Sequence, residues 1–430
     1  MKKVLIFTYY WPPAGGVAVQ RFLKFSKYLP EFGWQPIIVT VKNGSYPFTD
    51  KSLLQQVSDT TQVYRTDTFE PFEFYNLLQG KKGKSIPTVS VGGQQKQSWF
   101  QKISEYIRAN FFIPDARKGW VKYAVAEAEK IIAKEKIDTI ITTGPPHSTH
   151  LIGLQLKKEF GLKWVADFRD PWTNNLMNEF LPRTTSTIQK DLGLENEVLN
   201  HADAISVISE GMKDEFTDRA KQVAVIYNGF DADDFNVSPK LSAPYFTLRH
   251  VGNLIVSMNV PALWQAIAEL MREQTGFKEK FRLEIIGGIH PSVQESFRQA
   301  HIESNVIFTG HVPHSEAIAY MKGASCLLFL VSDVKKSELL MSGKIFEYIA
   351  AKRNILPIGP VNGNAAQLLK RCQRDEMIAF ADKEKVKRAL LNHFNNWQKT
   401  QTVFEYSGQE HLLYSRQHQC SALAQLLNQL

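Results

Sequence analysis

The chain has 430 residues and carries 51 Lys and Arg against 43 Asp and Glu, a net charge of +8. Its 43% hydrophobic and 22% charged residues are ordinary for globular proteins and exclude a disordered, collagen-like or coiled-coil chain. The length predicts two or three domains of about 100–200 residues each. Three cysteines without zinc-like spacing favour a reducing compartment over a disulfide framework or a zinc site.

The N-terminal stretch MKKVLIFTYYWPPAGG has a basic tip and a short apolar run, as signal peptides do. The run is only about seven residues long and Pro-Pro interrupts it, which argues against that interpretation. The sequence also has no apolar stretch near the ~20 residues of a membrane helix. We therefore expect a cytoplasmic protein that is either soluble or peripheral on the inner face of the cytoplasmic membrane.

Short apolar runs alternate with helical patterns in the first half of the chain, which predicts parallel βαβ units. The expected strands are VLIFTYY (4–10), PIIVTV (36–41), TIITTG (139–144), WVADFR (164–169), AISVIS (204–209) and VAVIYN (223–228). A helix is expected from Val17 to Phe32. Residues 42–117 break the alternation, are rich in Gly, Ser and Gln, and read as a long, mostly turn-like insertion.

A second alternating series begins after VSPKLSAP (237–244), which reads as a linker. Its expected strands are FTLRHVGN (246–253), RLEIIGG (282–288), VIFTGHV (306–312), CLLFLVS (326–332) and NILPIGP (354–360). The pattern predicts an α/β protein with two Rossmann-like, doubly wound domains that face each other across a cleft. In such sheets, ligands bind at the carboxyl ends of the strands.

Gly15 and Gly16 follow the first strand and precede a helix. Glycines at this place let backbone N–H groups approach an anion or a sugar. The sequence around them is neither GxGxxG nor a P-loop. A tight strand–helix turn is an equally good interpretation of the pair.

His147 lies near a helix start at the carboxyl end of TIITTG, and His150 follows at i+3. A histidine here could hydrogen-bond a substrate hydroxyl or the transferred group. A structural role is the alternative for a lone histidine beside a helix. A metal site is weaker still, because no acid accompanies the pair.

Asp167, Arg169 and Asp170 crowd the end of the strand WVADFR. Arg169 could bind an anionic ligand that Asp167 or Asp170 holds in place, and an internal ion pair is the alternative. The acidic run DADD (231–234) offers paired carboxylates to a metal, but its place after Asn-Gly favours capping and turn chemistry.

The most specific segment is ELLMSGKIFEYIAAKRNILPIGP (338–360). Ser342 is the expected N-cap of a helix with Lys344 in its first turn and Glu347 one turn later. A helix N-terminus with a first-turn lysine suits a diphosphate, and a carboxylate one turn on can accept both hydroxyls of a ribose. The alternative is a surface Lys–Glu pair worth a few tenths of a kcal/mol, roughly.

The two-domain layout and several motifs resemble the GT-B glycosyltransferases of the retaining family 4 type. The motifs that carry the resemblance are VLIFTYYWPPAGGVAVQR, ISVISEGMKDEF, VIYNGFDADDF, HVGN, RLEIIGG, VIFTGHVPHSE and SGKIFEYIAAKRNIL. The resemblance implies an acceptor domain over residues 1–240, with the insertion at about 42–117, and a nucleotide-sugar donor domain over 241–405. Residues 406–430 are then a segment that crosses back to pack on the first domain.

The resemblance also implies roles for individual residues. Glu347 matches the second glutamate of the family's donor motif, which contacts the donor ribose, whereas Leu339 stands at the first glutamate position. The segment VGN offers no cation after the first donor-domain strand, and Lys344 is the expected source of that positive charge. The residues expected to bind the donor are Gly15, Gly16, Arg169, Gly252, Asn253, Ser342, Gly343, Lys344 and Glu347. His147 and Asp170 are the expected catalytic residues, and neither a metal nor another cofactor is expected.

The expected activity is retaining transfer of a hexosyl or N-acetylhexosaminyl group from a nucleoside-diphosphate sugar to a hydroxyl of a glycan or polyisoprenoid-linked glycan. Polysaccharide or glycoconjugate synthesis at the cell surface is the expected setting. A GT-B-type sugar-nucleotide epimerase and a non-catalytic nucleotide-sugar-binding protein are the alternatives. No nucleic-acid partner is expected, because the sequence has no recognisable reader module.

Residues 81–122 hold nine Lys and Arg against two acids, an excess that attracts anionic partners. Within 96–122, Trp99, Phe100, Ile103, Tyr106 and Ile107 recur at helical spacing, with Lys102, Glu105 and Arg108 on the other side. Phe111, Phe112 and Ile113 form an apolar tip beside Arg117 and Lys118. The pattern predicts contact with an anionic membrane. The alternative is that the same stripe packs on the first domain.

Overall fold

The structure is a computed structural model that describes residues 1–69 and 99–430. Its contacts divide the chain into two compact units. The first consists of Met1–Tyr227 and Arg416–Leu430, and the second of Asn228–Ser415. Each unit has its own parallel sheet, so the ends of two different sheets are available to position functional side chains.

The described part of the first unit contains a seven-stranded parallel sheet, ordered β3-β2-β1-β4-β5-β6-β7. Its strands are β1 (Lys2–Thr8), β2 (Trp34–Val41), β3 (Gln62–Thr66), β4 (Thr139–Gly144), β5 (Lys163–Phe168), β6 (Ala204–Val207) and β7 (Val223–Val225). Every strand expected in the first half of the chain is present. The additional strand β3 lies at the sheet edge, inside the region expected to be mostly turns.

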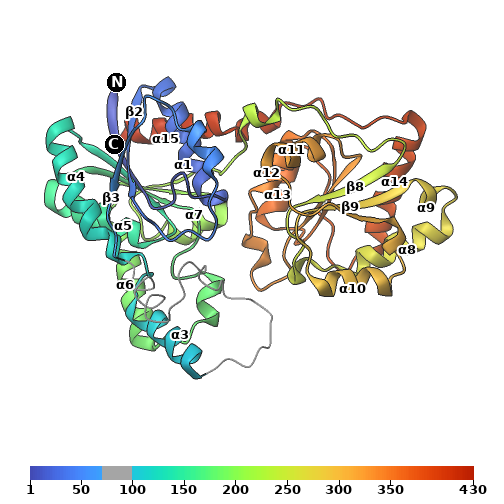
Figure 1. The fold of residues 1–430 in the computed structure, drawn as a ribbon, viewed down its shortest axis with the longest axis horizontal. Helices are drawn as coiled ribbons and strands as arrows, with labels where there is room; N and C mark the ends of the chain where they lie inside the picture. Colours follow the sequence, from blue (N-terminus) through green and yellow to red (C-terminus); the bar gives the residue numbers. More distant parts are fainter. Residues whose placement is uncertain (70–98) are drawn as a thin grey trace. The chain divides into compact units, whose positions relative to one another are not determined.

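Helices cover both faces of this sheet (Figure 1). The helices of this unit are α1 (Val17–Tyr28), α3 (Trp99–Phe111), α4 (Val121–Glu135), α5 (Ser148–Phe160), α6 (Thr185–His201), α7 (Glu210–Phe216) and α15 (Arg416–Gln429). Of these, α3 lies beside the start of α6 and not on a face of the sheet. Neighbouring residues of β1 point to opposite faces, as the pleat requires. Leu5 and Phe7 join the core formed with α4 and α5, whereas Val4 and Ile6 join the core formed with α1 and α15. The buried alternating strands thus explain the doubly wound arrangement.

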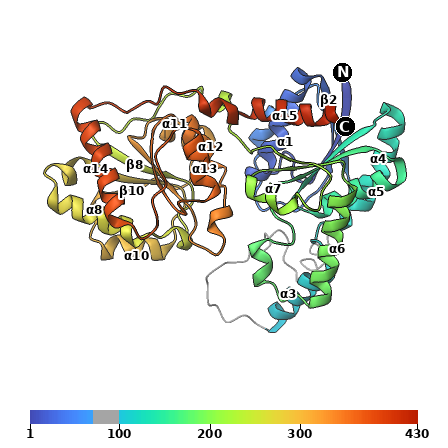
Figure 2. The same ribbon diagram turned by 180° about the vertical axis from the view of Figure 1, so that it is seen from behind.

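The C-terminal helix α15 returns to the first unit and packs beside α1 (Figure 2). Cys420, Leu423 and Leu427 of α15 are buried in one core with Phe25 and with Leu29, which follows α1. Residues from the two ends of the chain therefore complete one hydrophobic core. This contact confirms the expected C-terminal crossing back to the first domain.

Helix α3 is attached to the first unit through the side chain of Asn110. Its Nδ2 donates to the Pro182 carbonyl at 2.8 Å. Its Oδ1 accepts from the Thr184 N–H and from the Thr187 Oγ1, both at 2.8 Å, where α6 begins. Both halves of one amide are therefore used to join the end of α3 to the start of α6.

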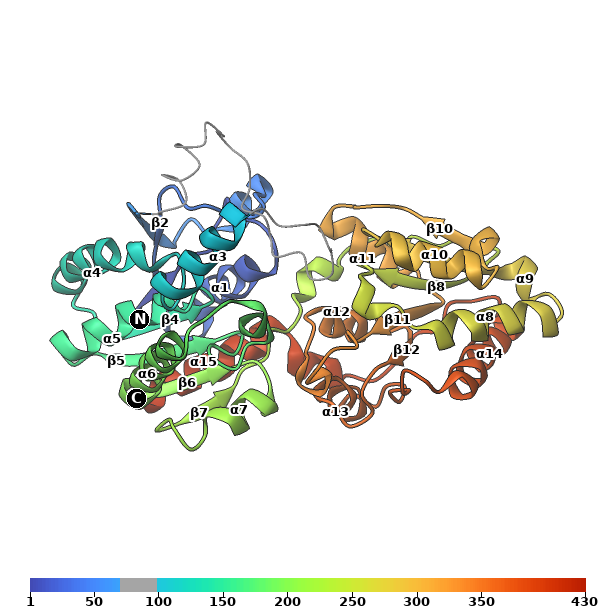
Figure 3. The ribbon, with the colours of Figure 1, turned by 90° about the horizontal axis from the view of Figure 1, so that it is seen from below.

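The second unit contains a five-stranded parallel sheet, ordered β10-β9-β8-β11-β12. Its strands are β8 (Phe246–Val251), β9 (Phe281–Ile286), β10 (Val306–Phe308), β11 (Cys326–Leu330) and β12 (Asn354–Ile358). Its helices are α8 (Pro261–Glu273), α9 (Phe277–Lys280), α10 (Pro291–Gln299), α11 (His314–Lys322), α12 (Lys344–Ala350), α13 (Asn364–Arg371) and α14 (Lys383–Thr400). Helices α8 and α14 lie side by side on the sheet (Figure 3) and share its core through Ile267 and Leu390. All five strands expected in the second half are found.

Within residues 1–69 and 99–430, no helix combines the length and the apolar character that a crossing of the bilayer requires.

Candidate functional site

The expected site residues of the first unit lie at the carboxyl ends of β1, β4 and β5. The two glycines that follow β1, Gly15 and Gly16, have different surroundings. The N–H of Gly15 donates to the Phe48 carbonyl at 2.9 Å, and a Cβ at this position would overlap the Phe48 ring. Gly16 has φ +88° with open space around it, and it is the residue before α1. Gly15 is thus needed for close packing, and Gly16 for its backbone conformation.

Asp167 belongs to a buried polar cluster. Its carboxylate accepts from Arg21 Nη2 at 2.7 Å, from Thr143 Oγ1 at 2.8 Å and from Ser206 Oγ at 2.7 Å. The internal ion pair considered for this strand end therefore exists, but its cation is Arg21 and not Arg169. With its oxygens already satisfied by three side chains, Asp167 is a structural carboxylate.

The Arg169 side chain, which follows β5, forms hydrogen bonds to backbone carbonyls at the end of β4 and in α1. Its Nε donates to the Gly144 carbonyl at 3.1 Å, and its Nη2 donates to the Pro145 carbonyl at 2.5 Å. Its Nη1 donates to the Ala18 carbonyl in α1 at 2.5 Å. The neighbouring Asp170 has no hydrogen-bonding partner among the described residues. Burial raises the pKa of Asp170, against an opposing contribution from Arg169.

His147 directly precedes α5 and stacks on Trp172, with ring centroids 5.2 Å apart and an interplanar angle of 7°. Its Nδ1 is buried and has no hydrogen-bonding partner in the described residues. Burial and the nearby Arg169 lower the pKa of His147 to about 3, while the Pro171 carbonyl opposes this shift. The imidazole is therefore neutral at physiological pH, suited to hydrogen bonding and not to carrying charge.

His150 lies on the inner side of the same turn. Its Nδ1 is 2.9 Å from Thr142 Oγ1, and its ring stacks on Phe168 at 4.3 Å. Burial, then His147 and Arg169, hold the pKa of His150 well below its usual value. The ring lies 6.0 Å from that of His147, and its Nε2, like Nδ1 of His147, is buried without a hydrogen-bonding partner among the described residues.

Two residues that support His147 were not expected from the sequence. Trp172 follows Asp170 by two positions, and its Nε1 donates to Asp191 Oδ1 at 2.8 Å. Asp115 accepts from both the N–H and the Oγ of Ser148, each at 2.8 Å, and so caps α5. The Asp115–Ser148 contact spans 33 positions of sequence, so no local pattern could reveal it.

In the second unit, two glycine turns meet at the carboxyl ends of β8 and β9. The N–H of Gly252 donates to the Ile286 carbonyl at 2.6 Å, and a Cβ on Gly287 would lie 2.5 Å from the Gly252 carbonyl oxygen. Asn253 Oδ1 accepts from the Gly288 N–H at 3.0 Å. Asn253 therefore joins the two turns, and its side-chain oxygen Oδ1 already accepts a hydrogen bond from the protein backbone.

Lys344 covers Gly252. A Cβ on Gly252, which has φ +120°, would overlap the Lys344 ammonium group. That ammonium group has no hydrogen-bonding or ion-pairing partner among the described side chains. Burial lowers the pKa of Lys344, and Glu347 opposes the shift. The lysine thus places a positive charge, without a bonded anion among the described residues, against the Gly252 backbone at the end of β8.

Helix α12 begins one residue later than the sequence predicts. Its N-cap is Gly343, without a side-chain cap, so the expectation of a Ser342 N-cap is wrong. Ser342 Oγ still accepts from the Lys344 N–H at 3.4 Å. Glu347 lies one turn into the helix, and Tyr348 faces the sheet, where its hydroxyl accepts from the Val251 N–H at 2.8 Å. This buried tyrosine fixes α12 against the end of β8.

Leu339 ends the 3-10 helix η8 (Ser337–Leu339), and its side chain is 40% exposed. Its carbonyl accepts from Asn364 Nδ2 at 3.0 Å. At this position the chain therefore presents an apolar group where a carboxylate is expected in the family motif.

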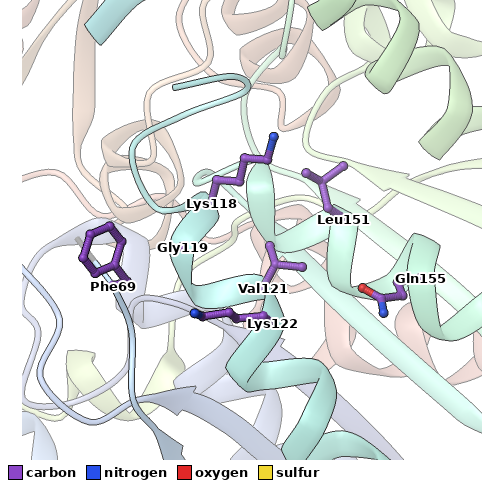
Figure 4. Close-up of a pocket in the computed structure, with 7 residues that line it drawn as sticks. All are labelled: Phe69, Lys118, Gly119, Val121, Lys122, Leu151 and Gln155. Atoms are coloured by element: carbon purple, nitrogen blue, oxygen red, sulfur yellow. The ribbon is translucent and has the colours of Figure 1, made fainter. Parts of the chain in front are cut away.

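A cavity of about 350 Å³ on the first unit is lined by none of the expected donor-binding or catalytic residues (Figure 4). It is lined by Phe69, Lys118, Gly119, Val121, Lys122, Leu151 and Gln155. Figure 4 shows the ammonium groups of Lys118 and Lys122 pointing in different directions, so they do not converge on one anion. Across the described ranges, no group of three or more His, Cys, Asp and Glu is arranged to hold a metal ion.

Comparison with solved structures defines the class of fold. Over 100% of this chain, sucrose-phosphate synthase from Thermosynechococcus elongatus aligns with a TM-score of 0.63 at 14% identity, covering 99% of that chain. HepE from Anabaena, solved with UDP, aligns over 100% of both chains with a TM-score of 0.61 at 14% identity. A TarM mutant from S. aureus aligns over 100% of this chain and 99% of that one, with a TM-score of 0.57 at 13% identity. The protein has the GT-B glycosyltransferase fold.

The sequence model of Glycosyltransferase Family 4 matches residues 89–234. This match and the fold together confirm the resemblance to GT-B glycosyltransferases of the family 4 type. No curated protein matches the chain significantly. The matched region contains His147, Arg169 and Asp170, whereas Lys344 and Glu347 lie outside it.

Proposed function

We propose that the protein transfers a hexosyl or N-acetylhexosaminyl group from a nucleoside-diphosphate sugar to a hydroxyl, with retention at the anomeric carbon. The observation that carries the donor part is Lys344. Its ammonium group is largely buried, lies over the Gly252 backbone and has no anionic partner at bonding distance among the described residues. A buried cation without a partner is costly, and a diphosphate would supply the missing charge.

The other donor contacts follow from the surroundings of Lys344. Glu347 lies one turn along the same helix and would accept the ribose hydroxyls. The absence of a side chain at Gly252 leaves room for Lys344 and would allow the diphosphate to approach the backbone. In the transfer, Lys344 would stabilise the charge that develops on the departing nucleoside diphosphate.

His147 and Asp170 are the proposed contacts to the transferred sugar and the acceptor. A neutral His147 can hydrogen-bond a sugar hydroxyl without placing a charge beside the positively charged oxocarbenium-like centre. The Asp170 carboxylate lies next to Arg169 and has no hydrogen-bonding partner among the described residues. With retention, the acceptor hydroxyl attacks from the face on which the diphosphate leaves, and its proton passes to the departing phosphate oxygen. No metal or other cofactor is invoked.

UDP is the first donor nucleotide to test, because HepE and TarM were each solved with UDP. Isothermal titration should detect binding of UDP, GDP or ADP to the parent and weaker binding to Lys344→Ala. Turnover of the matching nucleotide sugar should require an added acceptor. Isomerisation of the nucleotide sugar without acceptor would favour the epimerase, and binding without any turnover would favour a non-catalytic protein.

The proposed acceptor is a glycan or a polyisoprenoid-linked glycan at the inner face of the cytoplasmic membrane, in cell-surface polysaccharide or glycoconjugate synthesis. The support is the exposed apolar face of α3, formed by Trp99, Ile103, Tyr106, Ile107 and Phe111, each between 42% and 72% exposed. Aromatic and aliphatic side chains of this kind suit the interface between headgroups and acyl chains. WaaG, a solved structure of the same fold, is described as involved in lipopolysaccharide biosynthesis.

A further inference from the structure

Three elements of the second unit bring an acid, a histidine and the proposed ribose ligand into one row. Asp234 lies in the 3-10 helix η5 (Ala232–Phe235), His314 is the first residue of α11, and Glu347 lies in α12. His314 Nε2 is 3.1 Å from Glu347 Oε1, and His314 Nδ1 is 3.9 Å from Asp234 Oδ2. The acidic run DADD, which the sequence relates to turn chemistry, thus lies beside the histidine that contacts Glu347.

Two sets of hydrogen bonds fix the segment that carries Asp234. Asp231 caps η5 by accepting from the Asp233 N–H at 3.2 Å. At the end of α11, Lys322 Nζ donates to the Phe235 and Val237 carbonyls, both at 2.7 Å. The segment after η5 is therefore fixed to α11, and this places Asp234 beside the histidine at the start of that helix.

Within the described residues, His314 is the one side chain that hydrogen-bonds Glu347. A glutamate side chain has three rotatable bonds, so holding its carboxylate still for a ligand costs conformational entropy. A hydrogen bond from His314 restricts the Glu347 carboxylate before the ligand binds. Because an ionised carboxylate only accepts, His314 must present an N–H on Nε2. This bond engages Oε1 and leaves Oε2 of Glu347 for another donor.

We propose that His314 is a positioning residue for the donor: it holds the Glu347 carboxylate in the orientation that accepts the ribose hydroxyls. The inference rests on the proposed nucleotide-sugar function and extends it to a residue of α11, outside the helix that carries Lys344 and Glu347. It predicts that His314 increases the affinity for the nucleotide. This contribution should depend on the ribose hydroxyls and should vanish when Glu347 is replaced by alanine.

The experiment measures dissociation constants of UDP, GDP and ADP by isothermal titration, and continues with the nucleotide that the parent binds most tightly. His314→Ala should weaken binding about tenfold, the usual scale for a lost hydrogen bond to a charged group. His314→Gln, which keeps an N–H donor, should recover part of the affinity. His311→Ala is the matched control, because His311 is an exposed histidine in the loop that leads into α11, and it should bind as the parent does.

Two further measurements separate positioning from a general structural effect. The penalty of His314→Ala should shrink with the 2′-deoxy form of the nucleotide. Adding His314→Ala to Glu347→Ala should cause no further loss, because the two residues act through one contact. An unchanged melting temperature of His314→Ala would show that the fold is intact.

The outcomes also separate this inference from the proposed function. If the parent binds none of the nucleoside diphosphates, the proposed function fails and the positioning role fails with it. If the parent binds and Lys344→Ala weakens binding, but His314→Ala binds normally, the function stands and His314 has no positioning role. Additive losses in the double variant, or an equal penalty with the 2′-deoxy nucleotide, would likewise overturn the inference.

Discussion

His147 and Trp172 lie almost parallel, 5.2 Å apart, at the carboxyl ends of two neighbouring strands of the first sheet. The indole covers one face of the imidazole and fixes the plane in which its nitrogens lie. Aromatic pairs of this kind contribute about 0.5–1.5 kcal/mol beyond the area that they bury. The orientation of His147 therefore depends on a residue that sequence reasoning did not select.

The first prediction concerns these two residues. His147→Ala should lower the turnover number more than it weakens donor binding, because His147 lies outside the proposed nucleotide contacts. Trp172→Ala should lower turnover in the same way, and Trp172→Phe should retain more activity because a ring remains. Steady-state kinetics together with nucleotide titration test this. A turnover number unaffected by His147→Ala would move the catalytic role to Asp170 or to the substrate.

The second prediction concerns the dependence of stability on pH. An unfolded histidine has a pKa of about 6.5, whereas folded His147 has a pKa of about 3. Between these values the unfolded chain binds more protons, so the free energy of unfolding should fall as the pH is lowered from 6.5 towards 3. The contribution of the neutral histidine is fully present above pH 6.5.

Denaturant unfolding of the parent and of His147→Gln between pH 7.5 and 4.5 tests this sign. The parent should lose stability more steeply than the variant as the pH falls. His311→Gln, which removes an exposed histidine from the second unit, serves as the control. Parallel slopes for the parent and His147→Gln would show that His147 titrates normally in the folded protein.

The third prediction concerns the proposed donor contacts. Lys344→Ala and Glu347→Ala should each weaken nucleotide binding by about 1.5–3 kcal/mol, the range for hydrogen bonds that involve a charged group. Both should remain folded, because neither charged group is part of the hydrophobic core. Lys370→Ala, on the exposed side of α13, removes a charge elsewhere in the unit and should bind normally. Unchanged titration curves for Lys344→Ala and Glu347→Ala would exclude this donor assignment.

The fourth prediction uses two glycines with positive φ in the second unit. Gly252→Ala should reduce nucleotide affinity, because the new methyl group would displace the Lys344 ammonium group. Gly310 has φ +77° with open space around it, so Gly310→Ala imposes backbone strain without touching Lys344. Melting temperatures should show similar destabilisation in both variants. Nucleotide titration should show a loss of affinity only in Gly252→Ala. Equal affinities would mean that Lys344 does not need this space.

The strands could be predicted because each is a short apolar run buried in a doubly wound sheet. Strand β3 was missed because QVYRT carries polar residues at an exposed sheet edge, where little apolar surface is buried. The expected site residues were found at strand ends, which parallel sheets bring together. Their partners were not found: Arg21 is 146 positions from Asp167, and His314 is 33 positions from Glu347. Local residue spacing cannot predict contacts between positions so far apart in the sequence.

The predicted apolar tip after α3 needs correction. Phe111 is 72% exposed, but Phe112 is half-buried and Ile113 is buried. Arg117 is also buried, because its Nη2 donates to the Ser45 carbonyl at 3.0 Å and its guanidinium group stacks on Tyr9. Only Phe111 of the three tip residues is therefore exposed as expected, and Arg117 is unavailable to a lipid headgroup.

The last prediction is that α3 contacts an anionic membrane through its exposed apolar face. Ile103, Ile107 and Phe111 recur at i, i+4 and i+8 and lie on one side of the helix, while Asn110 attaches the helix to α6. Insertion of these side chains would not require any core residue to move. Lys118 and Lys122 are exposed nearby in sequence, and each cation near an anionic leaflet contributes about 1 kcal/mol, screened by salt.

Co-sedimentation with vesicles of phosphatidylcholine, with and without phosphatidylglycerol, tests this contact. Binding should need the anionic lipid, weaken as salt rises and fall sharply in the triple variant Ile103→Ser, Ile107→Ser, Phe111→Ser. Phe160→Ser is the matched control, because Phe160 is a 47% exposed aromatic residue of the same unit, at the end of α5. Nucleotide titration should be unaffected in the triple variant. If parent and triple variant sediment equally, the apolar face of α3 is not a membrane surface, and the lipid-linked acceptor loses its structural support.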